Sequence, residues 1–173
     1  NNIDTVLTYD NLADFKIGLE GKEIDFPVFI KPRTGSASVG AEKVNDLNQL
    51  EEKFEANPHY GYIIQELMVG DDLDVDVYVD CITNQPVAAF SKRKIETKIG
   101  GASKTVSFKD EALFELVKQI VPKFEFYGPI DMDFFYRDGK YYLSEINPRF
   151  GGAYLHGYGA GVDFYKMIIN NVN

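Results

Sequence analysis

The sequence predicts an α+β protein built as two lobes. Apolar residues recur at helical spacing in three segments: residues 10–19, 45–56 and 110–121. Short runs of strand-forming residues separate these segments, and residues 131–149 read as two strands joined by a tight turn. We expect Gly70 to be the hinge between a small lobe over about residues 22–69 and a larger lobe over about residues 70–173.

The small lobe is expected to contain two helices and two strands. Thr8 can cap the first helix, whose apolar face carries Leu12, Phe15 and Leu19. Asn45 can cap the second helix. The strands are expected in two apolar runs: residues 27–32 and 60–68.

A loop of small residues, 34–40, follows the first strand. Its backbone amides could wrap an anion, and its glycines allow close approach. Lys31 would lie beside it at the strand end. It is not a Walker loop, because Gly40 is followed by Ala41 and Glu42 rather than by Lys and Ser or Thr. An ordinary flexible turn beside a solvated lysine is the alternative interpretation.

The larger lobe begins with a strand in which acidic and apolar residues alternate. Asp72, Asp74 and Asp76 share one face of this strand. We expect Asp74 and Asp76 to form a solvated face. Asp72, next to the hinge, is the functional candidate.

The next elements are a strand over about residues 87–94, a basic loop over 98–104 and the helix over 110–121. Residues 150–161 are rich in glycine, so we expect a loop that closes over a site rather than packed structure. A final helix is expected over residues 162–169.

Four polar residues interrupt the apolar runs of the 131–149 hairpin: Asp131, Asp133, Glu145 and Asn147. A buried, unpaired carboxylate is costly, so a cation is expected nearby. Carboxylate and amide oxygens, together with substrate phosphates, are the ligands that Mg²⁺ takes. Alternatively, Asp131 and Asp133 face solvent on an edge strand and Glu145 pairs with Arg149.

The length of the turn decides whether these side chains share a face. A two-residue turn would pair Arg137 with Lys140, and strand alternation would place Asp133 and Glu145 on opposite faces. A three-residue loop would pair Tyr136 with Lys140 and bring the polar side chains to one face. The metal-site interpretation therefore calls for the three-residue loop.

Composition limits the class of protein. At 173 residues, 45% of them hydrophobic, the chain can bury one core. The net charge of -9 argues against nucleic-acid binding, although basic residues gather over 92–104. The single Cys81 excludes an internal disulfide, and no apolar run approaches the roughly 20 residues that cross a bilayer. We expect a soluble, cytoplasmic protein that does not bind membranes, and a piece of a longer chain, since the first residue is not Met.

Four segments in order resemble the ATP-grasp superfamily, and within it one ATP-grasp unit of the carbamoyl phosphate synthase large subunit: FPVFIKPRTGSASVG, IIQELMVGDDLDVDV, KRKIETKIGG, and DMDFF followed by EINPRFGG. The resemblance implies an ATP-grasp domain over residues 1–173, with the nucleotide between its two lobes. The family normally has an upstream domain that completes the substrate site. Full carbamoyl phosphate synthesis also needs two ATP units and an ammonia source, so this chain alone would not perform it.

The resemblance also implies nucleotide ligands. Lys31 would contact the ATP phosphates and Asp72 the ribose. A loop would cover the phosphates: Ser36, Ala37, Ser38 and Val39. The hinge would hold adenine through its backbone: Gln65, Glu66, Leu67 and Met68.

For the metal, the resemblance implies Asp133, Glu145 and Asn147 as ligands of Mg²⁺, with Mn²⁺ as a substitute. Arg149 would steady the transferring phosphoryl group. The basic loop supplies further candidates for phosphate and substrate contacts: Lys92, Arg93 and Lys98. A lysine, an amide-lined loop, an arginine and metal ions suit phosphoryl transfer, which is mostly positioning and charge neutralisation.

The implied activity is that of an ATP- and Mg-dependent ligase. It would activate a small carboxylate as an acyl phosphate for attack by an amine or similar nucleophile. Two alternatives are a nucleotide-binding regulatory module without turnover and a non-enzymatic interaction domain that uses its acidic face. The sequence leaves the oligomeric state open, and a homo-oligomer is compatible with it.

Overall fold

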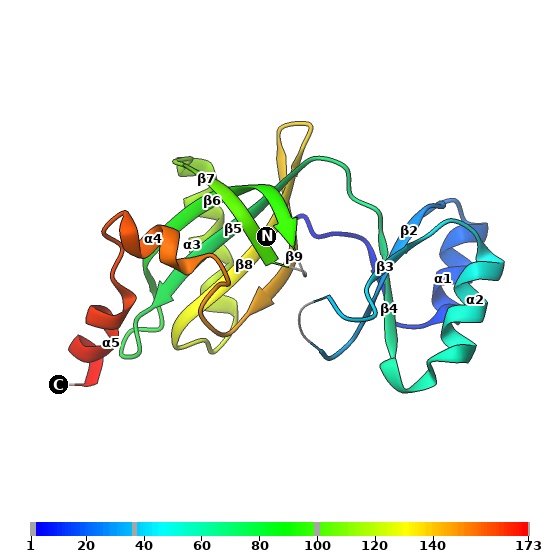
Figure 1. Cartoon of the computed structure of the whole chain (residues 1–173), viewed down its shortest axis with the longest axis horizontal. Helices are drawn as coiled ribbons and strands as arrows, with labels where there is room; N and C mark the ends of the chain where they lie inside the picture. Colours follow the sequence, from blue (N-terminus) through cyan, green and yellow to red (C-terminus); the bar gives the residue numbers. More distant parts are fainter. Residues whose placement is uncertain (1–2, 36–37, 99–100, 173) are drawn as a thin grey trace. The chain divides into compact units, whose positions relative to one another are not determined.

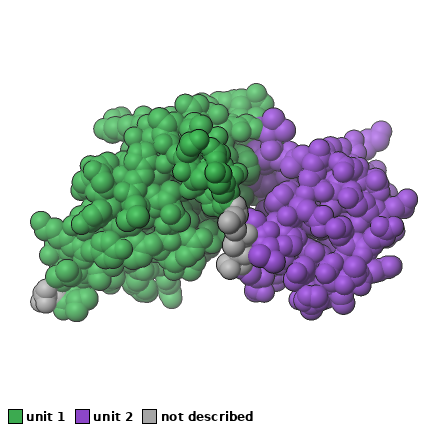
Figure 2. Space-filling model, in the orientation of Figure 1, with its two compact units in different colours: residues 1–5, 70–173 green, residues 6–69 purple. Residues whose placement is uncertain are grey.

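The computed structural model describes residues 3–35, 38–98 and 101–172. The chain divides into two compact units, residues 6–69 and residues 1–5 with 70–173 (Figure 2). Both units combine an antiparallel sheet with helices, so the predicted α+β class is confirmed (Figure 1). No helix in the described part of the chain is long and apolar enough to cross a membrane.

The smaller unit has a four-stranded sheet in the order β1-β4-β2-β3. Its strands are β1 (Thr8–Tyr9), β2 (Val28–Pro32), β3 (Glu42–Val44) and β4 (Tyr62–Glu66). Its helices are α1 (Leu12–Glu20), α2 (Leu47–Ala56) and the short 3₁₀ helix η1 (Pro58–Tyr60). Phe15 of α1 and Leu50 of α2 pack with Val28, Ile30 and Ile64, so both helices cover one face of the sheet (Figure 1).

Both helices of this unit begin later than the sequence predicts. Asn11 caps α1 by accepting a hydrogen bond from the Asp14 N–H, and Asp46 caps α2. Thr8 lies in β1 instead, and its hydroxyl bonds the Val6 carbonyl. Expecting Thr8 and Asn45 as caps was therefore wrong, because Asn11 and Asp46 are equally good cap residues that lie closer to the apolar stripe.

The larger unit has a five-stranded sheet in the order β7-β6-β5-β8-β9. Its strands are β5 (Asp71–Val79), β6 (Pro86–Lys98), β7 (Gly101–Phe108), β8 (Gly128–Arg137) and β9 (Lys140–Asn147). Helix α3 (Glu111–Ile120), followed by the 3₁₀ helix η2 (Val121–Lys123), covers one face. Leu113 and Val117 of α3 pack there with Val75 and Met132 of the sheet.

Two predictions for this unit were wrong. The basic loop expected over 98–104 is mostly strand, because β6 continues to Lys98 and pairs with β7 from Gly101 onward. The glycine-rich segment expected to be a loop contains α4 (Tyr154–Gly159), and α5 (Phe164–Val172) follows it. Tyr154 and Phe164 are buried with Tyr78 in an aromatic cluster that anchors both helices.

Candidate functional site

The turn between β8 and β9 has two residues, so the expected three-residue loop is wrong. Asp138 and Gly139 have φ angles of 52° and 79°, and Arg137 pairs directly with Lys140. Positive φ at both central positions is typical of a type I′ turn, which the Asp-Gly dipeptide favours. Strand alternation alone would then place the candidate metal ligands of the two strands on opposite faces.

A bulge at Ser144 brings these ligands back to one face. The register shifts between Asp133 and Phe134, so that Asp133 pairs with Glu145 and one residue of β9 stays unpaired. Such a residue reverses the alternation of the strand beyond it. The four polar side chains therefore share a face, as the metal-site interpretation requires: Asp131, Asp133, Glu145 and Asn147.

A row of polar residues crosses the whole sheet on this face. Successive cross-strand partners form it, one from each strand: Ser107, Lys92, Asp74, Asp133 and Glu145. Leu73 and Val75, the neighbours of Asp74 in β5, point to the opposite face and join the core under α3. The sheet thus separates an apolar core from a polar face.

Lys92 lies at the centre of this face and is fully buried. Its ammonium donates a hydrogen bond to Asp76 Oδ2 and lies 3.0 Å from Asp74 Oδ1. Burial raises the pKa of Asp76 to about 6, although the Lys92 charge acts in the opposite direction. The prediction that Asp74 and Asp76 form a solvated face was therefore wrong. The missed signal was a lysine in the neighbouring strand that could face both carboxylates.

Asp131 extends this buried cluster toward Arg149. Its Oδ2 accepts a hydrogen bond of 2.9 Å from Arg149 Nη1, which also donates to the Phe150 carbonyl at 2.8 Å. Burial, together with the nearby charges of Asp74 and Asp133, raises the pKa of Asp131 to about 8. Asp131 is therefore neither a solvent-facing residue nor a simple ion-pair partner.

Three carboxylates, from Asp74, Asp76 and Asp131, place oxygens within 4.8 Å of one another, a spacing that could hold a metal ion. The Lys92 ammonium, however, already contacts two of them and supplies the compensating positive charge. Buried charges are tolerated when they are paired in this way. We interpret this cluster as structural.

Lys94 connects Asp72 with Asp133. Its Nζ lies 2.9 Å from Asp72 Oδ1 and 2.6 Å from Asp133 Oδ1. Burial opposes the charge on Lys94, but the two carboxylates outweigh this effect and raise its pKa. Asp133 is oriented from both sides, because its Oδ2 lies 3.5 Å from the Asn147 amide nitrogen, a weak hydrogen bond.

The residues Asp133, Glu145 and Asn147 form a donor set that suits Mg²⁺. All three carry hard oxygen donors and lie on neighbouring strands of one face. Glu145 is exposed to solvent, so an arriving nucleotide-bound ion could reach it. The chemistry of the donors therefore fits the ion that the sequence predicts.

The ATP-grasp domain model matches residues 16–153. The chain belongs to the ATP-grasp family. The match covers strands β2 to β9 and ends just beyond the Asp133–Asn147 donor set and Arg149.

Curated relatives of this ATP-grasp chain include D-alanine--D-alanine ligases. That of Francisella philomiragia is 29% identical over 140 residues, which cover 75% of this chain and 47% of the relative. That of Francisella tularensis subsp. novicida is 27% identical over 135 residues, or 72% of this chain and 46% of the relative. The chain thus spans about half the length of the curated relatives it matches.

Solved structures show the same ATP-grasp fold. Biotin carboxylase from Campylobacter jejuni superposes with a TM-score of 0.75 at 19% identity, covering 96% of this chain and 42% of that one. D-alanine--D-alanine ligase from Bacillus anthracis gives a TM-score of 0.64 at 18% identity, covering 98% of this chain and 61% of that one. At these identities the likeness concerns the fold alone.

The expected nucleotide ligands of this ATP-grasp chain lie mainly in the smaller unit. Lys31 is half-buried at the end of β2, and Gln65 and Glu66 end β4. The Gln65 side chain donates to the Thr8 hydroxyl at 2.9 Å, and its backbone lies within the sheet between β1 and β2. Two hinge residues follow β4, and the second is buried: Leu67 and Met68. Ser38 and Val39 are exposed in the small-residue loop, whereas Ser36 and Ala37 lie outside the described residues.

The basic candidates separate onto different surfaces. Arg93 lies between Lys92 and Lys94 in β6, so alternation turns it to the opposite face, where it pairs with Asp71 at 3.1 Å. Lys98 is largely exposed and pairs with Glu96 at 3.0 Å. Of the predicted catalytic residues, Arg149 is the one that contacts the polar face. Lys94, which the sequence analysis did not select, contacts it as well.

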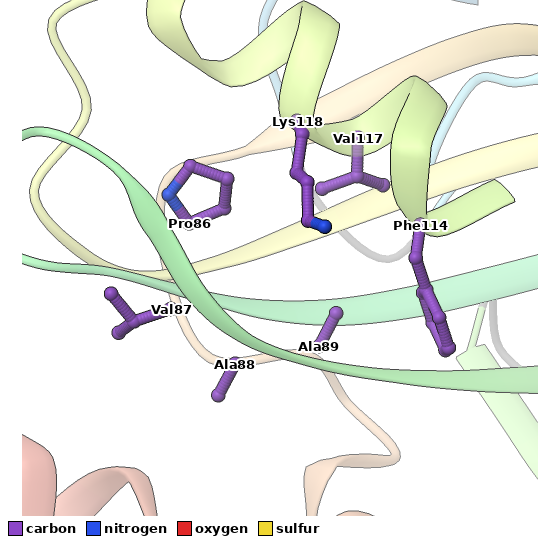
Figure 3. A pocket seen from close by; sticks show the side chains of 7 residues that line it. All are labelled: Pro86, Val87, Ala88, Ala89, Phe114, Val117 and Lys118. Atoms are coloured by element: carbon purple, nitrogen blue, oxygen red, sulfur yellow. The ribbon is translucent and has the colours of Figure 1, made fainter. Parts of the chain in front are cut away.

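A pocket of about 200 Å³ lies on the other side of the same unit, between α3 and β6 (Figure 3). Its lining is mostly apolar and includes Pro86, Ala89 and Phe114. Its one charged residue, Lys118, pairs with Glu115 on its own helix at 2.6 Å. The pocket lacks the convergent polar groups of the sheet face, so we do not assign the nucleotide to it.

Proposed function

We propose that this chain is the nucleotide- and metal-binding part of an ATP- and Mg-dependent ligase. In this proposal, the enzyme activates a small carboxylate as an acyl phosphate, which an amine or similar nucleophile then attacks. The observation that carries the proposal is the pairing of Asp133 with Glu145 on the same face as Asn147, with Arg149 bonded to Asp131 of the same strand as Asp133. Membership in the ATP-grasp family supports the reaction class.

Each residue of the proposed site has a distinct role. Asp133, Glu145 and Asn147 would hold Mg²⁺, or Mn²⁺ in its place. When bound, the ion would offset the negative charge of the triphosphate. Arg149 would contact the transferring phosphoryl group, and Asp131 and the Phe150 carbonyl hold its guanidinium in place.

The smaller unit would supply most of the remaining nucleotide contacts. Lys31 would meet the phosphates, with residues 36–39 covering them, and the backbone of residues 65–68 would bind adenine. Asp72, in the larger unit, would bind the ribose. Lys98 stays in the proposal as a substrate contact, since its side chain is 70% exposed, whereas Arg93 is left out because it lies on the opposite face.

The relatives support the general class of substrates, a carboxylate and an amine, but not their identity. D-alanine--D-alanine ligases join two D-alanine molecules, as their name states, and two amino acids are joined through the carboxylate of one and the amine of the other. We propose the same bond type here, with the EINPR segment over residues 145–149 favouring a unit similar to that of carbamoyl phosphate synthase. The carboxylate and the amine would be small molecules rather than nucleic acid or lipid.

The test combines binding with turnover. Calorimetry of the chain should detect ATP only when Mg²⁺ is present, and the full-length protein should release ADP when a matching carboxylate and amine are supplied. Binding of ATP without ADP release across a broad panel of acids and amines would indicate a regulatory module instead. No affinity for Mg-ATP would contradict the proposal and favour an interaction domain.

A further inference from the structure

We propose that Lys94 is the resident counter-cation of the metal site and makes metal binding depend on the nucleotide. The inference rests on the proposed function, because it concerns the same Asp133 carboxylate. It assigns a role to a lysine that neither the motif analysis nor the family resemblance selects.

The Lys94 ammonium bridges two carboxylates that have different proposed roles. It lies 2.6 Å from Asp133 Oδ1, on a proposed metal ligand, and 2.9 Å from Asp72 Oδ1, on a proposed ribose ligand. The Lys94 side chain is only 15% exposed, so water screens these charges weakly. Lys94 therefore already holds a positive charge where a free divalent ion would have to bind.

The neighbouring cations are committed elsewhere. Lys92 contacts Asp74 and Asp76, and Arg149 contacts Asp131. Within the described part of the chain, Lys94 is the cation that forms an ion pair with Asp133.

A divalent ion on Asp133 would lie within a few ångströms of this ammonium and be repelled by it. An ion that arrives with a triphosphate brings several negative charges, which give the ammonium a new partner. Asp72 can remain a partner of the Lys94 ammonium when the metal is bound, because Asp72 already pairs with Lys94 and is not a proposed metal ligand. The site should thus bind the metal–nucleotide complex and reject the free ion.

The experiment measures Mn²⁺ binding to the whole chain without nucleotide, by electron paramagnetic resonance. The Lys94→Met variant should bind free Mn²⁺ at least about tenfold more tightly than the wild type, because the repelling charge is gone. Lys94→Arg keeps the charge and should behave like the wild type. Lys118→Met, which removes an exposed lysine from α3, controls for net charge and should change nothing.

The double variant Lys94→Met/Asp133→Asn should lose the tighter Mn²⁺ binding of Lys94→Met. This loss would show that the Mn²⁺ binds at Asp133. Unchanged or weaker Mn²⁺ binding by Lys94→Met, or a gain that survives Asp133→Asn, would overturn the inference. Lys94→Gln gives the same readout if Lys94→Met does not fold, as judged by circular dichroism. Mg-ATP binding by the wild type is measured separately: its absence rejects the proposed function, whereas the Mn²⁺ comparison alone decides the role of Lys94.

Discussion

Asp133 and Glu145 lie directly opposite each other on β8 and β9 because Ser144 is an extra residue in β9. The two-residue turn would otherwise separate them onto different faces of the sheet. Bulges often lie next to functional sites, where they redirect side chains. A single unpaired residue thus decides whether the candidate metal ligands can converge.

Replacing Glu145 with Ala should abolish metal-dependent ATP binding while changing the free energy of unfolding by less than about 1 kcal/mol. The reason is that Glu145 is exposed, so the change removes charge from a site rather than volume from a core. Calorimetry with Mg-ATP and urea unfolding are the two measurements. Glu115→Ala, an exposed acid on α3, should leave binding intact. If Glu145→Ala unfolds the protein instead, the residue is structural.

The sequence predicted much of the larger unit, because its signals there are local. The Asp-Gly dipeptide marked the β8–β9 turn, and the alternation of acidic and apolar residues marked β5. The convergence of Asp133 with Glu145 was also expected, but for the wrong reason. A three-residue loop and a two-residue turn followed by a bulge both place Asp133 and Glu145 on the same face of the sheet. Nothing in the sequence marks Ser144 as the unpaired residue.

Removing the charge of Lys92 should destabilise the protein strongly. Lys92→Met leaves Asp74 and Asp76 buried without their cation, which typically costs about 3–5 kcal/mol in the free energy of unfolding. Urea unfolding monitored by circular dichroism measures this cost. Lys118→Met, an exposed lysine with a surface partner, should cost less than about 0.5 kcal/mol. Equal stabilities of the two variants would show that the buried ion pairs contribute little.

The buried charge cluster could not be predicted from the sequence, because it depends on the register between strands. Asp74 meets Lys92 only because β5 and β6 pair as they do, and Asp131 meets Arg149 across a chain reversal. Alternation alone showed which residues share a face of one strand. Whether that face is solvated is a tertiary property, and here Gly151 lies against it.

Substituting Gly151 with Ala should disturb the segment that follows Arg149. A Cβ at Gly151 would overlap Asp76 Oδ1 and crowd Asp131 Oδ1, so the backbone would have to move away from the carboxylates. We expect a loss of about 1–3 kcal/mol in the free energy of unfolding, the usual cost of overpacking. Gly152→Ala is the matched control, since open space surrounds Gly152. Comparable unfolding midpoints for both variants would contradict the close contact.

The free energy of unfolding should depend on pH through Asp80, which lies in the turn that follows β5. Asp80 accepts hydrogen bonds from the Asn171 amide and from the backbone and hydroxyl of Thr83, and these lower its pKa to about 2. In the unfolded chain the Asp80 carboxyl has a pKa near 4. The Asp80 carboxylate therefore stabilises the fold fully above about pH 4, and this contribution is lost as the pH falls through about 2.

The test compares the wild type with Asp80→Asn by urea unfolding between about pH 2 and pH 7, a range that spans the folded and unfolded pKa values of Asp80. The wild type should be the more stable protein at neutral pH, and the difference should shrink steadily below about pH 4, since a protonated Asp80 resembles the amide. Asn171→Ala removes the hydrogen bond that lowers this pKa the most, so its own difference from the wild type should also shrink at low pH. A stability difference that stays constant across this range would mean that Asp80 acts through the shape of the turn rather than through its charge.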